Sequence, residues 1–137
     1  HKAGSKTVYE FHGNSSRFVC KNCDSVYPLK DINITEEPAL CPKCNHLLKP
    51  DFIFFGEGIP YDAYQTSIDA AEDCDVFIII GTSGEVSPAN MIPGLAKQNG
   101  AIIIEINKEM SLYTNKITDI ILEGKAGEIL SQLGIMS

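Results

Sequence analysis

The apolar positions of residues 51–137 form short continuous runs separated by stretches of helical spacing. Runs rich in β-branched residues predict buried strands over residues 75–80, 101–106 and 119–122. The intervening stretches carry apolar side chains three and four positions apart, which predicts helices over residues 60–72, 88–98 and 125–133. Pro93 should kink or divide the second helix. Helices that alternate with continuously apolar strands predict a parallel α/β sheet covered on both faces.

The remaining residues have a different texture. Residues 19–50 contain four cysteines and many turn residues with little periodicity, which predicts a small metal-binding module. Residues 1–18 mix short polar and apolar positions. No internal repeat and no low-complexity tract interrupts this division.

Two Cys-x2-Cys pairs are the strongest chemical signal in the chain. Cys20 and Cys23 form one pair, Cys41 and Cys44 form the other, and residues 24–40 separate them. This spacing is typical of a Zn²⁺ site in which each pair supplies two thiolates. Four thiolates leave no open coordination position, so the site should be structural; the alternative is four buried, unpaired cysteines. Cys74 stands apart and is interpreted as a small buried apolar residue rather than a catalytic thiol.

Polar loops follow the first two predicted strands. Gly81-Thr82-Ser83-Gly84 comes directly after residues 75–80, and Asn107 ends residues 101–106. Ligands of open parallel sheets bind at the carboxyl ends of the strands, and small residues let the backbone approach a nucleotide. A plain tight turn and an ordinary turn asparagine are the alternatives for these two loops.

Charge and hydropathy narrow the classes of partner. The net charge of −7 over 137 residues argues against direct nucleic-acid binding through a general basic surface. No apolar run approaches the roughly 20 residues that span a bilayer, and no signal peptide is recognisable. We therefore expect an intracellular, cytoplasmic protein without a membrane partner, while the oligomeric state stays open.

Several segments together resemble the sirtuin family. Residues 1–6 and Glu10-Phe11-His12-Gly13 resemble the segment that carries the family's catalytic histidine, and the cysteine pairs follow in the family's order. Other matching segments are Lys49-Pro50-Asp51, Phe54-Phe55-Gly56-Glu57, Gly81-Thr82-Ser83, Val86, Pro88-Ala89, Glu105-Ile106-Asn107 and Lys125-Ala126-Gly127-Glu128. Taken alone, a lone histidine such as His12 is more often structural than catalytic.

The resemblance implies a partial Rossmann-like sheet with a small zinc-binding module, and an NAD-dependent protein-lysine deacylase. It places residues 1–18, the catalytic-histidine segment, in the same NAD-binding domain as residues 51–137. The implied reaction removes an acyl group, acetyl above all, from lysine and yields nicotinamide and O-acyl-ADP-ribose, with His12 as general base. The implied NAD contacts are Gly81, Thr82, Ser83 and Asn107. The implied contacts to the acyl-lysine substrate are Ile53, Phe55, Gly56, Glu57 and Val86. Phe52 to Phe55 is a short apolar run that ends at Gly56. Together with the resemblance, it predicts that residues 53–57 form an extended edge that pairs with the substrate backbone.

Three departures from the family pattern matter. The Gly-Ala-Gly phosphate loop, the flexible cofactor-binding loop and the Gln-Asn-x-Asp segment of the family do not precede His1, so we expect a fragment that is inactive alone. Gly84 stands where the family often has a larger apolar residue, and Phe11 replaces the usual leucine. The alternatives are a mono-ADP-ribosyltransferase on the same scaffold and a catalytically incomplete zinc-binding fragment.

Overall fold

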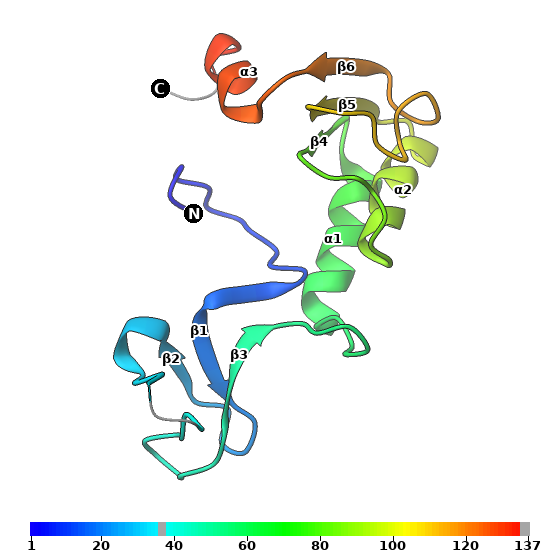
Figure 1. Ribbon diagram of the computed structural model, residues 1–137. Helices are drawn as coiled ribbons and strands as arrows, with labels where there is room; N and C mark the ends of the chain where they lie inside the picture. The colour runs from blue at the N-terminus through cyan, green and yellow to red at the C-terminus, as the bar shows by residue number, and fades with distance from the viewer. Residues whose placement is uncertain (36–37, 135–137) are drawn as a thin grey trace. The chain divides into compact units, whose positions relative to one another are not determined.

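The computed structural model describes residues 1–35 and 38–134 and divides the chain into two compact units (Figure 1). The smaller unit is Glu10–Pro60, and the larger one combines His1–Tyr9 with Tyr61–Ser137. The smaller unit therefore extends beyond residues 19–50 on both sides and includes His12. Among the described residues, no helix has the length and apolar content needed to cross a membrane.

The smaller unit is built on an antiparallel sheet with strand order β2-β1-β3. Its elements are β1 (Gly13–Cys20), β2 (Val26–Pro28), the 3₁₀ turn η1 (Leu29–Asp31) and β3 (Leu48–Phe52). Its core consists of Cys20, Cys41 and Leu48, with Phe18 and Tyr27 packed against them. A core this small rests mainly on the cysteine cluster.

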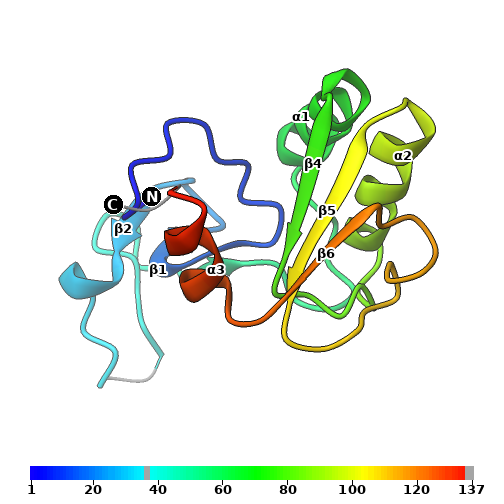
Figure 2. The ribbon, with the colours of Figure 1, turned by 90° about the horizontal axis from the view of Figure 1, so that it is seen from above.

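The larger unit contains the predicted parallel sheet, with strand order β4-β5-β6. Its elements are α1 (Tyr61–Asp73), β4 (Val76–Ile80), η2 (Ala89–Met91), α2 (Ile92–Gln98), β5 (Ile102–Asn107), β6 (Ile120–Glu123) and α3 (Ala126–Gln132). The three strands run side by side in one direction (Figure 2). Each predicted strand and helix is present, so the predicted fold class is confirmed.

Proline and small residues set the helix positions. Pro93 lies in the first turn of α2, where its missing N–H leaves no helical hydrogen bond unmade. The predicted helix over residues 88–98 is accordingly divided into η2 and α2. The buried core joins α1, α2 and one face of the sheet through Ala71, Ala96, Ile79 and Ile103.

The prediction that both faces of the sheet are covered is wrong for the other face of β4. Val76, Ile78 and Ile80 alternate with the buried Ile79 and are 46%, 43% and 44% exposed. α3 is drawn on the far side of the strands from α2 (Figure 2). A continuously apolar strand can be buried on both faces, but its sequence does not show whether other elements cover both faces.

Candidate functional site

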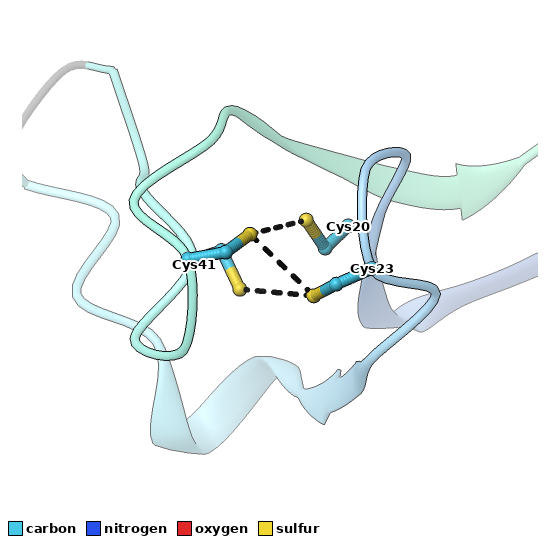
Figure 3. Close-up of side chains that lie close together, drawn as sticks. Cys20, Cys23 and Cys41 are labelled. Carbon is cyan, nitrogen blue, oxygen red and sulfur yellow. Dashed lines mark hydrogen bonds between the residues drawn. The ribbon is translucent and has the colours of Figure 1, made fainter.

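The four predicted zinc ligands come together in the smaller unit. The Sγ atoms of Cys20, Cys23, Cys41 and Cys44 all lie within 4.8 Å of one another. Individual Sγ–Sγ distances are 3.4 Å for Cys20–Cys44, 3.7 Å for Cys23–Cys41 and 3.5 Å for Cys23–Cys44. Figure 3 shows the labelled thiols turned toward a common centre. All four cysteines are free thiols rather than disulfides.

This geometry fits a Zn²⁺ ion. Zn–S bonds of about 2.3 Å in a regular tetrahedron place the sulfurs about 3.8 Å apart, close to the separations of this cluster. Four soft ligands match the preference of zinc and leave no position for water or substrate. The cluster can therefore hold a structural zinc ion and not a catalytic one.

Two similar turns present the cysteine pairs. Asp24 N donates to Cys20 O at 2.9 Å, and Asn45 N donates to Cys41 O at 2.8 Å. Asp24 and Asn45 both have positive φ, 53° and 60°. Aspartate and asparagine tolerate this left-handed conformation better than other residues with side chains, so each turn ends on a suitable residue.

Hydrogen bonds favour the thiolate form of Cys41, whereas burial favours the protonated form of Cys20. Burial by itself raises the pKa of the Cys41 thiol, but the Tyr27 hydroxyl and the backbone N–H groups of Cys44 and Lys43 outweigh it and lower the pKa to about 6. Tyr27 Oη lies 3.3 Å from Cys41 Sγ. Burial raises the pKa of Cys20 to about 11. Metal binding has to remove the proton of the Cys20 thiol, whereas the lowered pKa of Cys41 already favours the thiolate that binds a metal.

His12 lies on a well-defined turn at the start of β1. Gly13 N donates to Glu10 O at 2.9 Å, which closes the turn, and Ile53 N donates to His12 O at 3.0 Å, which ties it to the segment after β3. The imidazole is exposed and meets the Phe11 ring edge-on, with centroids 5.3 Å apart. An exposed imidazole on a fixed backbone can accept a proton from a bound substrate.

The predicted extended edge over residues 53–57 is wrong in shape. β3 ends at Phe52, and Glu57 N donates to Phe54 O at 2.9 Å, so Phe54 to Glu57 forms a turn. The Glu57 carboxylate accepts from Phe54 N at 2.9 Å and pairs with Lys49 at 2.7 Å, which holds the turn closed. Phe55 is 98% exposed at its tip. The apolar run indicated a strand, but Gly56, with φ of +89°, and Glu57 favour a turn instead.

The residues predicted for nucleotide binding lie at one edge of the parallel sheet. Ile80 pairs with Ile106, so the loops after β4 and β5 begin side by side. Asn107 Nδ2 donates to Thr82 O at 2.7 Å, and Ser83 O accepts from Leu112 N at 2.9 Å. Thr82 and Ser83 are exposed, and no heavy atom lies within 4 Å of the position that a Cβ on Gly81 would take. This edge therefore offers open space and hydroxyl groups to a ligand.

A buried carboxylate that was not among the predicted ligand contacts supports this edge. Glu105 is 1% exposed, and its Oε2 accepts hydrogen bonds from Thr114 Oγ1 and Thr118 Oγ1 at 2.9 Å each. Burial raises the pKa of Glu105, but hydrogen-bonding hydroxyls of Ser111, Thr118 and Thr114 outweigh it and lower the pKa. The carboxylate thereby ties the loop after β5 to the sheet. A charged residue inside an apolar strand was the available signal.

Tyr113 is a second residue that the sequence did not mark. Its ring packs against Gly84, where an added Cβ would lie 2.7 Å from Tyr113 Cε2, and its hydroxyl donates to Asn90 O at 3.3 Å. Gly84 has φ of +78°. A larger residue at position 84 would displace the Tyr113 ring, so the buried position of Tyr113 requires glycine at position 84. Val86, predicted to contact substrate, is 45% exposed in the same region.

A Rossmann-like parallel sheet with polar loops at its carboxyl edge, joined to a four-cysteine zinc-type module, defines the class of this protein. The model of the Sir2 family matches residues 1–88, and the chain therefore belongs to the Sir2 family. This confirms the resemblance that the motifs indicated.

Related proteins agree with this assignment. NAD-dependent protein deacylase 2 of Pyrobaculum aerophilum is 46% identical over 132 residues, which is 96% of this chain and 52% of the relative. The NAD-dependent protein deacylase of Pyrococcus furiosus is 43% identical over 137 residues, which is 96% of this chain and 54% of the relative. The chain thus spans about half the length of these curated relatives.

Solved structures of the family share the fold. Sir2Tm bound to a propionylated peptide superposes with a TM-score of 0.86 at 28% identity and covers 98% of this chain and 59% of that one. A mutant Sir2 homologue in complex with ADP ribose gives 0.88 at 36% identity, covering 95% of this chain and 52% of that one.

Proposed function

We propose that the protein carrying this chain is an NAD-dependent protein-lysine deacylase. The observation that carries the proposal is the turn at residues 10–13, which presents an exposed imidazole and is hydrogen-bonded to Ile53, beside the proposed peptide-binding turn. The relatives named as deacylases support the same activity.

In this proposal each segment has one role. Residues 1–18 supply the catalytic histidine, residues 19–50 the zinc module, and residues 51–137 the carboxyl-terminal half of the NAD-binding domain. NAD supplies the ADP-ribosyl group that receives the acyl chain, with release of nicotinamide. Gly81, Thr82, Ser83 and Asn107 bind NAD at the carboxyl edge of the sheet. Zinc holds the smaller unit together and takes no part in the chemistry.

His12 acts as the general base. With NAD bound, an imidazole nitrogen would remove the proton from a ribose hydroxyl. The hydroxyl oxygen would then bond to the acyl carbon, the bond from that carbon to the lysine nitrogen would break, and lysine would leave as the free amine. Neutral imidazole is the common side-chain base near pH 7. Ile53, Phe55, Gly56, Glu57 and Val86 contact the acyl-lysine peptide, and the exposed Phe55 ring supplies apolar surface. The turn over Phe54–Glu57 directs substrate pairing to Ile53 and its neighbours rather than to a long edge.

We further propose a cytoplasmic location and no direct nucleic-acid partner. Free cysteines arranged as metal ligands suit a reducing compartment. The net charge of −7 disfavours phosphate backbones and is compatible with basic lysine-rich substrates.

The test is product identification on a hybrid enzyme. This chain replaces the matching 132-residue stretch of the Pyrobaculum aerophilum relative, and the hybrid is incubated with NAD and an acetyl-lysine peptide. We expect free lysine peptide, nicotinamide and O-acetyl-ADP-ribose by mass spectrometry. A control hybrid carries the corresponding stretch of the Pyrococcus furiosus relative.

The alternatives give different products. A mono-ADP-ribosyltransferase would release nicotinamide and label protein with ADP-ribose while the acetyl group stays on the peptide. A catalytically incomplete chain would leave NAD and peptide unchanged in a folded, zinc-loaded hybrid whose control counterpart is active. Either result would reject the deacylase assignment.

A further inference from the structure

A bulge in β1 lies directly after the His12 turn. Asn14 pairs with Asp51 and Phe18 pairs with Pro50, so residues 15–17 have no partners of their own on β3. Bulges bend a strand and re-aim its side chains, and they are frequent beside functional sites. Here Arg17 is the residue at the end of the bulge, and its guanidinium reaches back toward the start of the strand.

The guanidinium joins two carboxylates from different segments. Arg17 Nε donates to Asp51 Oδ2 at 2.5 Å, and Arg17 Nη2 donates to Glu10 Oε2 at 2.6 Å. The second oxygen of Glu10 accepts from Asn14 Nδ2 at 2.5 Å, while Asn14 Oδ1 accepts from Ser16 N at 2.8 Å. We call Glu10, Asn14, Arg17 and Asp51 the polar clamp.

Charge and partial burial stabilise the polar clamp. The side chains of Arg17, Glu10 and Asp51 are 37%, 20% and 28% exposed. The hydrogen bond from Asn14 lowers the pKa of Glu10, burial opposes it, and Arg17 adds to the lowering. Glu10 is therefore ionised near neutral pH, and its pairing with Arg17 is a charge-assisted one.

The clamp joins the two backbone supports of His12. One support is the turn hydrogen bond from Gly13 N to Glu10 O, and the other is the bond from Ile53 N to His12 O. Glu10 belongs to the first support, and Asp51 lies two residues before Ile53 in the second. The Arg17 guanidinium thus links the segment before His12 to the segment that hydrogen-bonds the His12 backbone.

We propose that Arg17 is a positioning residue that, through Glu10 and Asp51, fixes the His12 turn on the segment after β3. This rests on the proposed role of His12 as the base. A base has to stay within hydrogen-bond reach of the proton it removes, and supporting contacts of this kind keep a reactive side chain within about 0.5 Å of its working position.

The test uses this chain loaded with zinc. Arg17→Met removes the clamp, and Arg17→Lys keeps the charge without the two-pronged donor. Lys30→Met is the control, because Lys30 is an exposed cation of the same unit. Hydrogen exchange is followed at the amides of Gly13 and Ile53. The imidazole NMR signals of His12 are compared with those of His46, an exposed histidine of the same unit.

We expect Arg17→Met to accelerate exchange at both amides roughly tenfold, as the loss of a charged hydrogen bond predicts. The His12 signals should shift toward those of a free histidine as its contact with Phe11 loosens, while the His46 signals stay unchanged. Arg17→Lys should give a smaller change in the same groups.

Two results overturn the proposal. One is exchange within twofold of wild type at both amides, with unchanged His12 signals, in both Arg17 variants. The other is the same pattern of change in Lys30→Met. These readouts require no turnover, so failure of the positioning role is distinguishable from failure of the deacylase assignment, which the hybrid enzyme tests separately.

Discussion

Gly13 is the position where one methyl group should do most harm to the candidate site. Its φ is +77°, and a Cβ built on it would lie 2.3 Å from Asp51 O and 2.8 Å from Phe52 Cα. Both atoms belong to the β3 backbone, which cannot move aside as the end of a flexible side chain could. Gly13→Ala should therefore push β1 away from β3 directly beside His12.

The magnitude follows from two parts. A left-handed conformation costs a residue with a Cβ about 1–2 kcal/mol. Separation of the strands also strains the bonds from Gly13 N to Glu10 O and from Ile53 N to His12 O, at about 1 kcal/mol each. Gly13→Ala should thus cost about 3–4 kcal/mol locally. Gly56→Ala is the matched control, because Gly56 has φ of +89° with no atom within 4 Å of the added Cβ, and it should cost about 1–2 kcal/mol.

Native-state hydrogen exchange at the Ile53 amide measures this difference. A gap of about 2 kcal/mol corresponds to exchange roughly 30-fold faster in Gly13→Ala than in Gly56→Ala. Exchange rates that agree within about threefold would contradict the predicted clash with β3, and so would a Gly13→Ala structure in which Asp51 O has not moved.

Three further substitutions test the zinc cluster, the polar edge of the parallel sheet and the buried carboxylate of Glu105. Tyr27→Phe removes the hydroxyl beside the zinc thiolates and should speed zinc transfer to a chelator about tenfold; a rate equal to that of the exposed control Tyr61→Phe would contradict this role. Asn107→Ala removes the bond to Thr82 O and should weaken ADP-ribose binding by the hybrid enzyme about tenfold at unchanged zinc content; unchanged affinity would remove Asn107 from the binding edge. The pKa of Glu105 is lowered from 4.5 in the folded chain, so its stabilising effect is complete above about pH 4.5 and is lost as the pH falls through the folded-state pKa. As the pH falls below about 4.5, hydrogen exchange in β5 should accelerate more in wild type than in Glu105→Gln. Parallel pH profiles for the two proteins would exclude a stabilising role of the Glu105 carboxylate.

The elements and the cysteine cluster were predictable because each leaves a local signal. β-branched runs marked β4 and β5, and Cys-x2-Cys spacing marked two turns whose thiols could share one ion. The exposed face at Ile78 was not predictable, because periodicity reports which side chains are apolar and not what covers them.

Contacts between distant residues were also out of reach. The joining of Arg17 to Asp51 depends on a bulge whose position no local pattern records. The pairing of Gly84 with Tyr113 requires knowledge of how the loop after β5 folds back. The turn at Phe54–Glu57 was not predicted because a short apolar run favours a strand, although Gly56 allows a turn.

The most direct test of the central claim is the ratio of deacetylation to nicotinamide exchange in the hybrid enzyme carrying His12→Ala. If His12 is the base for the ribose hydroxyl, deacetylation should fall by about 10²–10⁴ while nicotinamide exchange and ADP-ribose binding persist, because release of nicotinamide precedes the step that needs the base. His46→Ala is the control and should keep both activities. Near-wild-type deacetylation by a folded, zinc-loaded His12→Ala hybrid would contradict the account.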